Sequence, residues 1–224
     1  MRLLVLRLEG PLQSWGERSK WDNRDSALMP TKSGIIGIIA CAMGISRGDE
    51  RVVELHDKLT VAVRADMPGR LGTDYHTVSS SSLMTADGKQ QDRTIVSFRQ
   101  YLQDASFTVF LASQDNGLLD SIVHSLRHPV WTAFLGRKSC VPTCPLIPAD
   151  TEEYASIKDA LDGYPFAERV DKETEAFRAE IESAQGAYLR NDSLRTGDRR
   201  FTVRRVEYYP VRRKNEDVSL QIDA

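Results

Sequence analysis

The chain contains few of the residues on which secreted scaffolds and metal sites depend. It has three cysteines at uneven spacing and four histidines among 224 residues. An odd cysteine count without a repeated spacing argues against a disulfide framework and favours a reducing compartment, so we expect a cytoplasmic protein. Cys140 and Cys144 have no second pair, and His124 and His128 have no evident third ligand, so we expect no metal and no cofactor.

Long hydrophobic runs are also absent. The most apolar stretch, residues 35–45, is much shorter than the roughly 20 residues that a membrane helix needs, so no membrane partner is expected. The short apolar run at residues 3–6 has no small-residue cleavage site after it, which argues against a signal peptide. The sequence has no serine elbow, paired-carboxylate signature or dinucleotide fingerprint, so the common hydrolase and dehydrogenase classes are not expected.

Charge is present in separate blocks, although the net charge is only −2. Residues 150–183 contain eleven acidic and four basic side chains, a local charge of −7. Residues 190–214 contain nine basic and three acidic side chains, a local charge of +6. Salt screens charges over about 8–10 Å, so phosphate binding depends on the local field. The basic block is therefore either a phosphate-binding surface or the partner of the acidic block within the fold.

Hydrophobic patterning predicts an α+β fold. Alternating or continuous apolar runs predict strands, and a period of about 3.6 residues predicts helices. The expected elements are a strand over 2–8, a buried helix over 33–43, strands over 59–66, 98–102 and 106–112, and a helix over 118–126. A strand after the loop at Gly136 would complete the order βαββαβ, which is the ferredoxin-like arrangement.

A polar stretch interrupts this order, and a change of composition ends it. Residues 68–96 are polar and contain the turn signal Asp87-Gly88, so we expect a projecting thumb hairpin. We assign residues 1–147 to the ferredoxin-like domain and residues 148–224 to a smaller C-terminal extension. In the extension we expect solvated acidic helices over 151–161 and 171–184 and then a basic strand or hairpin over 199–211.

The segment FLGRKSC, residues 134–140, has the composition of a phosphate-binding turn. Gly136 would let a phosphate approach the backbone, and Ser139 would donate a hydrogen bond. Arg137 and Lys138 would neutralise the phosphate charge. The segment lacks the earlier glycine of a nucleotide P-loop. By composition alone, an ordinary surface turn is the simpler explanation.

The segment PTKSG, residues 30–34, lies at the expected start of the buried helix. Backbone N–H groups at Lys32 and Ser33 would there face an anion, as at other helix N-termini. A plain helix cap is the alternative. Within the helix, Gly34 and Gly37 would let a neighbouring backbone come close.

Aromatic side chains occur beside cations in polar stretches of the chain. Single-stranded RNA is commonly held by bases that stack on aromatic rings next to cations, although aromatic residues more often belong to a core. The aromatic residues are Trp15, Trp21, Tyr75 and Tyr101, and the nearby cations are Arg18, Arg24, His76 and Arg99. Tyr75 with His76 would also suit metal-independent RNA cleavage, because histidine carries protons near neutral pH.

Five segments together resemble the CasD family, the type I-E members of the CRISPR repeat-associated (RAMP) proteins that cap the 5′ end of the guide RNA. The combination is specific, although each segment alone is not, and it covers about residues 1–147. The segments are LRLEGPLQSWG (6–16), PTKSGIIG (30–37), DYHTV (74–78), YLQDASFTV (101–109) and FLGRKSC (134–140).

This resemblance implies a ferredoxin-like, RRM-like RNA-binding domain with a thumb hairpin. It implies a non-catalytic subunit of the Cascade surveillance complex, a ribonucleoprotein of antiviral defence. The implied partners are the 5′ handle of the guide RNA (crRNA), the backbone subunit and the large subunit, with target DNA near the flanking motif as a further candidate. With the patterns above, it predicts RNA contacts by Trp15, Arg24, Lys32, Ser33, Arg64, Tyr75, His76, Thr77, Arg99, Tyr101, Gly136, Arg137, Lys138 and Ser139.

Two alternatives to this function remain. Relatives in type I-C systems are endoribonucleases that cut repeat RNA with tyrosine, lysine and histidine side chains. Here no lysine lies beside Tyr75 and His76, so the resemblance favours a subunit that holds RNA without cutting it, and no catalytic residue is expected. The other alternative is a protein-only scaffold whose basic C-terminal block pairs with an acidic partner.

Overall fold

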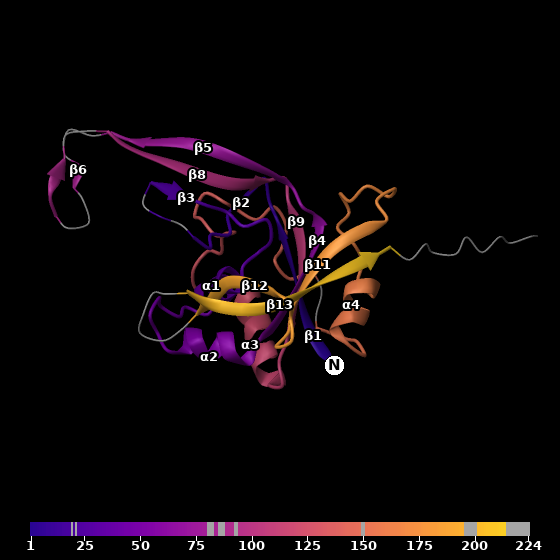
Figure 1. The fold of residues 1–224 in the computed structure, drawn as a ribbon. Helices are drawn as coiled ribbons and strands as arrows, with labels where there is room; N and C mark the ends of the chain where they lie inside the picture. The colour runs from indigo at the N-terminus through magenta and orange to yellow at the C-terminus, as the bar shows by residue number, and fades with distance from the viewer. Residues whose placement is uncertain are drawn as a thin grey trace, which may run out of the picture.

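The computed structural model describes residues 1–18, 20, 22–79, 83–84, 88–91, 94–148, 151–194 and 201–213. Its body is a seven-stranded antiparallel sheet with the strand order β10-β1-β9-β4-β11-β13-β12 (Figure 1). The strands are β1 (Arg2–Glu9), β4 (Thr60–Met67), β9 (Ser106–Ala112), β10 (Glu152–Glu153), β11 (Ala176–Glu182), β12 (Tyr188–Leu194) and β13 (Phe201–Arg212).

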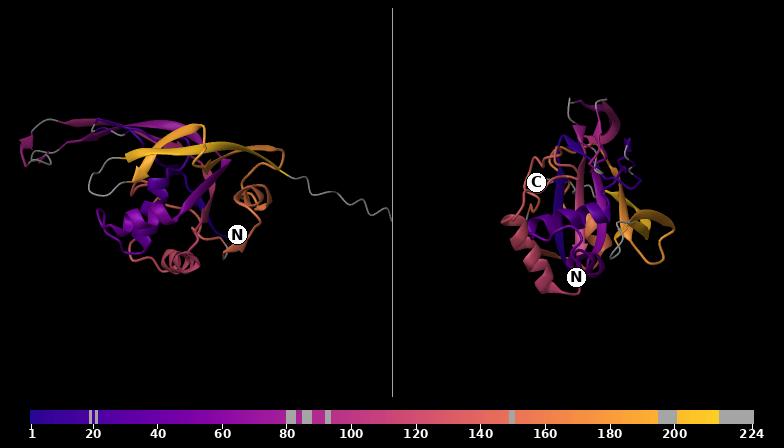
Figure 2. Two further views of the ribbon diagram at one scale, coloured as in Figure 1. Left: turned by 60° about the horizontal axis from the view of Figure 1, so that its bottom comes forward. Right: turned by 90° about the vertical axis from the view of Figure 1, so that its left-hand side faces the viewer.

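Helices cover both faces of this sheet, and in Figure 2 α4 (orange) lies apart from the other three. The helices are α1 (Lys32–Ala42), α2 (Arg51–Lys58), α3 (Asn116–Arg127) and α4 (Ile157–Gly163). β1 is apolar along most of its length because both of its faces are buried. Leu4 and Leu6 pack into the layer with α1, α2 and α3, whereas Leu3 and Val5 pack into the layer with α4. No helix in these described residues is long and apolar enough to cross a membrane.

The buried helix α1 begins and ends as its sequence predicts. Thr31 is the N-cap, and its side-chain oxygen accepts a hydrogen bond from the backbone N–H of Gly34 at 3.2 Å. Gly44, just past the helix, has a φ of +69°, a conformation that glycine adopts without strain. The expected strands over 2–8 and 106–112 are likewise confirmed as β1 and β9.

The expected hairpin is present, and it projects from the body (Figure 1). β5 (Arg70–Val78) pairs with β8 (Ile95–Gln103) in antiparallel register, from Arg70 opposite Gln103 to Val78 opposite Ile95. Nearer the tip, β6 (Leu83–Met84) pairs with β7 (Gln90–Gln91). In the predicted turn, Gly88 has a φ of +79°, whereas Asp87 lies outside the described residues.

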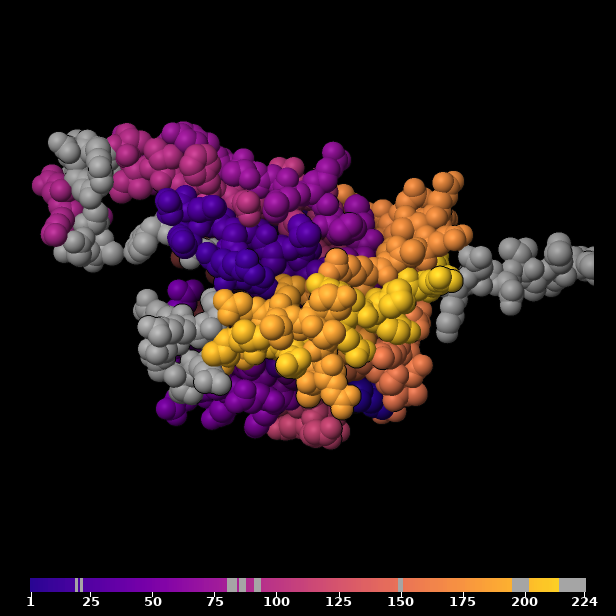
Figure 3. Space-filling model, viewed as in Figure 1, coloured from indigo at the N-terminus to yellow at the C-terminus, as the bar shows by residue number. Residues whose placement is uncertain are grey.

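Two short strands fix the hairpin to the body along the other edge of β8. β2 (Leu12–Gln13) pairs with the end of β8, and β3 (Asn23–Arg24) runs parallel to its middle, with Arg24 opposite Arg99. In Figure 3 these residues (indigo) lie directly beneath the hairpin (magenta).

Three expectations for the chain beyond β9 are wrong. The helix expected over 171–184 is the strand β11, because Phe177, Ala179 and Ile181 alternate with polar residues and are buried. Helix α4 begins later than the helix expected over 151–161. No strand follows the Gly136 loop directly; the strand next to β1 on that side of the sheet is β10 instead.

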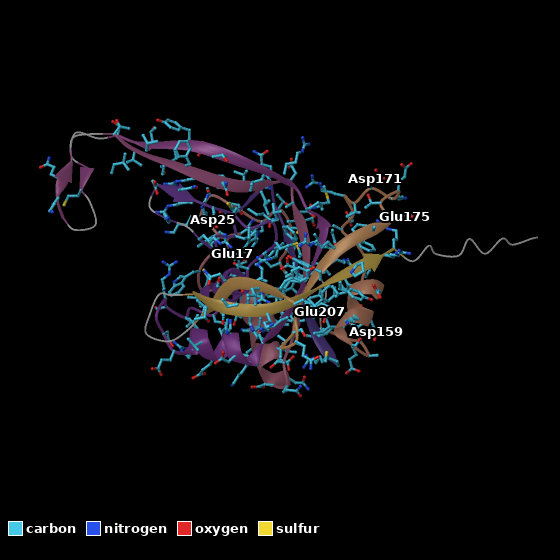
Figure 4. The ribbon with its side chains drawn as sticks, viewed as in Figure 1. Glu17, Asp25, Asp159, Asp171, Glu175 and Glu207 are labelled. Atoms are coloured by element: carbon cyan, nitrogen blue, oxygen red, sulfur yellow. The ribbon has the colours of Figure 1, made fainter. Side chains whose placement is uncertain are left out.

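Two arginines of the basic C-terminal block neutralise carboxylates within the fold. Arg190 forms ion pairs with Glu180 and with Glu17, and Arg204 pairs with Asp192 at 2.7 Å. All of these groups are buried or half-buried. In Figure 4, Glu17 lies between the hairpin and the C-terminal strands. Of these pairs, only Arg190–Glu180 joins the basic block to the acidic block, because Glu17 lies outside both blocks and Asp192 lies within the basic block.

Candidate nucleic-acid interface

The turn at Gly136 requires glycine for two reasons. Its φ is +91°, and a Cβ atom there would lie 1.7 Å from the backbone oxygen of Ser14. In the backbone, Leu135 donates to Cys140 at 2.7 Å and Cys140 donates to Arg137 at 2.8 Å, which closes the turn. Ser14 donates to Leu135 at 3.0 Å. The glycine therefore lets this loop pack directly on the segment that follows β2. The side chains of Lys138 and Ser139 are exposed beside it.

Arg137 fastens the turn to the base of the hairpin. Its guanidinium donates to the backbone oxygens of Gln100 and Arg24, both at 3.0 Å, and lies 4.6 Å from the centre of the Tyr101 ring. The sequence predicted that the Arg137 guanidinium binds a phosphate, but two of its nitrogen atoms donate to these backbone oxygens instead. Arg137 is thus chiefly a positioning residue, and Lys138 is the exposed cation of the turn.

Ser33 and Gly136, from the two predicted anion-binding segments, line one groove of about 760 Å³. The exposed side of α1 forms its floor at Gly37, where a Cβ atom would have no neighbour within 4 Å. Trp131, which is 45% exposed, and Arg47 also line the groove. The helix start and the glycine turn therefore lie on the same side of the molecule.

The predicted site residues Tyr75, His76 and Thr77 do not form one patch. Successive side chains of a strand point to opposite faces, and residues directly opposite in an antiparallel pair share a face. The register places Tyr75 and Thr77 with Phe98 and Val96. His76 instead shares its face with Arg99, on the other side of the hairpin.

We call these surfaces the uncharged face and the charged face. The charged face carries Asp74, His76, Arg99 and Tyr101, with Arg24 next to Arg99 on β3. Because Arg137 lies over the ring of Tyr101, the glycine turn adjoins the charged face. The uncharged face carries Leu71, Thr73, Tyr75, Thr77, Val96 and Phe98.

Three predicted RNA contacts, Trp15, Arg64 and Lys32, are instead interior residues. Trp15 is 1% exposed and packs against Gly34, where a Cβ atom would lie 2.8 Å from the indole ring. Arg64 is 0% exposed, pairs with Asp66 at 2.6 Å and donates to backbone oxygens near α4. Its face of β4 is covered by α4, so it meets no solvent. The fourth predicted aromatic, Trp21, lies outside the described residues.

Lys32 is also buried, at 3% exposure, and its ammonium group pairs with Glu182 at 2.8 Å. Burial lowers the pKa of Lys32, and Glu182 opposes that shift. The backbone N–H of Lys32 donates to Asp192 at 2.8 Å, and Arg204 holds the same carboxylate. Burial alone would raise the pKa of Asp192, but the hydrogen bonds from Arg204 and the Lys32 backbone, together with the charges of Arg204 and Arg190, lower it overall. The Asp192 carboxylate thus occupies the place at the N-terminus of α1 where the sequence predicted a bound anion.

The geometry does not support a Tyr75–His76 cleavage pair. The two side chains lie on opposite faces of the hairpin, so they cannot approach one phosphate together. Across the residues that the structure describes, no cluster of histidine, cysteine, aspartate and glutamate side chains could hold a metal ion.

The sequence profile of the family described as CRISPR-associated protein (Cas_Cas5) matches residues 3–216. The chain belongs to this family. It is 30% identical to the CRISPR system Cascade subunit CasD of Escherichia coli (strain K12), with 93% of this chain and 95% of the relative covered. The resemblance to the CasD family is therefore confirmed.

Two solved structures of CRISPR-associated proteins resemble this chain. A chain of a CRISPR RNA-guided surveillance complex superposes with a TM-score of 0.77 at 31% identity, covering 94% of this chain and 90% of that one. A crystal structure of a Cas protein gives a TM-score of 0.74 at 33% identity, covering 94% and 95%. The mixed α/β body with its large antiparallel sheet is thus shared with both structures.

Proposed function

We propose that this Cas5-family chain is a non-catalytic subunit of a Cascade-type surveillance complex, where it holds the 5′ handle of the guide RNA. One observation carries the proposal. The Gly136 turn and the Ser33 helix start line a single groove, and the glycine turn adjoins the charged face of the hairpin. The handle would pass from this groove onto that face.

Phosphates and bases would be held by different parts of this surface. Exposed Lys138 and Arg24, with half-buried Arg99, supply cations for phosphates, and Ser139 supplies a hydroxyl donor. The half-buried ring of Tyr101 and the exposed ring of Trp131 are platforms on which bases would stack. His76 would add a ring-nitrogen contact. Such a mixture binds single-stranded RNA without any group placed for cleavage.

We infer that the core is ferredoxin-like, and that its usual RNA-binding face is not the path of the RNA here. The strands β10-β1-β9-β4 correspond to the fourth, first, third and second strands of βαββαβ order. RRM domains of this type bind RNA on the open face of their sheet. Here α4 covers that face, so the RNA would lie instead at the groove and the hairpin.

The remaining partners follow from the proposed complex. We expect contacts with its backbone and large subunits in the cytoplasm, and we retain target DNA near the flanking motif as a further candidate. Membership of the family and the likeness to a surveillance complex support this expectation.

The salt dependence of handle binding tests the proposal. Each phosphate neutralised on a single strand contributes about 0.7 to the slope of log affinity against log salt. Lys138→Ala should therefore reduce the slope by about 0.7 when the full chain is titrated with labelled handle RNA. Lys172→Ala, an exposed lysine in the turn before β11, is the control and should leave the slope unchanged. Equal slopes for Lys138→Ala and the unaltered chain would contradict a phosphate contact there.

A further inference from the structure

The three C-terminal strands carry a row of one cation and two rings that the proposed RNA path does not use. The guanidinium carbon of Arg178, on β11, lies 3.8 Å from the centre of the Tyr208 ring on β13. The centre of that ring lies 4.1 Å from the centre of the Tyr188 ring on β12. β13 is the middle strand of the three, so Tyr208 stands between the other two side chains. Tyr188 ends the row and is 51% exposed. We call Arg178, Tyr208 and Tyr188 the ring stack.

A second exposed cation lies on the same face of the sheet. Tyr208, Pro210 and Arg212 alternate along β13, so their side chains point to one side. Arg178 lies opposite Pro210 and shares that side. Arg212 is exposed at the end of the strand. The carboxylate of Glu207 points to the other side, where it forms an ion pair with α4 (Figure 4).

This face carries more positive charge than its own carboxylates neutralise. Its acidic side chains on β11 and β12 are Glu180, Glu182 and Asp192, and each forms an ion pair with a cation of the chain. Neither Arg178 nor Arg212 forms an ion pair with any residue that the structure describes. The surplus of two exposed cations favours an anionic ligand.

The stacked arrangement indicates what kind of anion fits. A guanidinium that lies flat on a ring still directs its N–H donors outward from its edge, where they suit phosphate oxygens. The exposed ring of Tyr188 offers a surface on which a base would stack, and every base can stack in this way. An apolar protein surface would instead remove the charges of Arg178 and Arg212 from water without a partner. Unpaired nucleotides therefore fit this face better than a protein does.

The ring stack is separate from the groove. Tyr188 begins β12, and Leu194 at the other end of the strand lines the groove. Such a length of strand spans about 20 Å. Between the two ends, Arg190 is occupied by its ion pairs with Glu17 and Glu180. A strand of RNA in the groove therefore does not cover the ring stack.

We propose that the ring stack and Arg212 form a second site for single-stranded nucleic acid, in addition to the handle-binding surface. The two arginines neutralise phosphates, and a base stacks on Tyr188. Such contacts recognise an unpaired base next to a phosphate, whatever the base, and either RNA or DNA supplies this chemistry. The site thus goes beyond the proposed function, which concerns the handle alone.

Double variants on opposite faces of the C-terminal strands test this site. Tyr188→Thr/Arg178→Gln removes the exposed ring and a cation while keeping a residue that favours strands. Leu189→Thr/Arg205→Gln makes matched changes to exposed residues of the other face and is the control. Each full chain is titrated with labelled oligouridine and oligothymidine of about ten nucleotides, and separately with handle RNA. Matching thermal unfolding establishes that each chain is folded.

The ring-stack variant should bind the oligonucleotides at least about fivefold more weakly, with handle affinity changed less than about twofold. Its slope of log affinity against log salt should fall by about 0.7. The control variant should match the unaltered chain. Tyr188→Trp should retain the affinity, because an indole ring also stacks on bases. Binding of either oligonucleotide supports the site, and the one bound more tightly identifies RNA or DNA as the source.

Three results would overturn the assignment. Equal losses in the ring-stack and control variants would show that the oligonucleotides bind elsewhere. An equal loss of handle affinity in the ring-stack variant would make the stack part of the handle path. Unchanged oligonucleotide affinity would leave the face without this ligand, and loss of a subunit from the co-expressed complex would then identify a protein contact.

The proposed function and this site fail in different ways. If the unaltered chain does not prefer handle RNA over the oligonucleotides, the proposed function is refuted. The oligonucleotide titration of the ring-stack variant would still test the second site.

Discussion

The interior of the body and the hairpin of this protein use arginine in opposite ways. In the body, Arg64, Arg190 and Arg204 are buried and their guanidinium groups are taken up by carboxylates and backbone oxygens. Beside the hairpin, Arg24 is exposed and Arg99 half-buried. A buried ion pair whose partner is removed leaves an uncompensated charge, whereas an exposed cation contributes little to stability. The same residue type thus supports the fold in one region and is available for a ligand in the other.

The largest expected effect follows from removing a buried arginine. Arg64→Ala removes one of the two guanidinium groups that lie 2.6 Å from the buried Asp66 carboxylate. It also leaves the backbone oxygens of Leu161 and Tyr164 without their buried donor. We expect the free energy of unfolding to fall by about 3–5 kcal/mol, measured by urea denaturation. Arg99→Ala, on the hairpin, should change it by less than about 0.5 kcal/mol. Similar losses of unfolding free energy in Arg64→Ala and Arg99→Ala would contradict the difference between body and hairpin.

The glycine turn gives the next largest effect. Gly136→Ala meets both an unfavourable φ and a clash with Ser14, so the loop must move. Gly48 has a similar φ of +93° but no neighbour within 4 Å, and Gly48→Ala isolates the conformational cost, about 1–2 kcal/mol. Gly136→Ala should destabilise the chain by more than this and also weaken handle binding. Equal destabilisation by Gly136→Ala and Gly48→Ala would show that the Gly136 loop moves away from Ser14 without losing stability.

A smaller effect concerns pH. His56 is 5% exposed, and burial lowers its pKa, with Lys32 adding to the shift. At a pH between the lowered pKa of folded His56 and its ordinary value, the unfolded chain therefore carries a proton on His56 that the folded chain does not. Stability should fall as the pH drops below about 6.5, by at most about 1.4 kcal/mol per pH unit from this group. His56→Leu should flatten the profile of unfolding free energy between pH 7 and 5, and exposed His128→Gln should leave it unchanged.

The smallest expected change in stability has the opposite sign. Gly37→Ala adds a methyl group in open space within α1 and should stabilise the chain by about 0.5–1 kcal/mol. The same methyl group enters the groove, so handle affinity should fall. Gly117→Ala, in α3 and outside the groove, should bring the helix benefit without that loss. An unchanged handle affinity of Gly37→Ala would show that the RNA does not contact the groove at this position.

Sequence reasoning succeeded where one local pattern decides the structure. The continuous apolar run of β1, the capped α1 and the polar hairpin could all be predicted from neighbouring residues. It failed at β11, where acidic composition hid the alternation of Phe177, Ala179 and Ile181. It also failed at Arg64, because the cover over its face comes from α4, far along the chain.

The candidate site was predictable only in part for the same reason. The Gly136 turn could be recognised from its composition. Gly37 could not, because its place in a helix predicted a close neighbouring backbone, whereas a Cβ atom there would have no neighbour within 4 Å. Trp131 gave no signal, because its loop is brought to the groove by a hydrogen bond between Val130 and the end of α1. Tyr75 and His76 lie on opposite faces of the hairpin because side chains alternate along a strand, but their neighbours on each face are known only from the hairpin register.

The contact between Asp192 and the start of α1 has a consequence for how the protein is made. The carboxylate that fixes the backbone of Lys32 lies 160 residues further along the chain. During translation, the beginning of this helix therefore emerges long before its partner exists. The groove at its side is completed only when nearly the whole chain has left the ribosome, so a prematurely terminated product would lack a finished surface for nucleic acid.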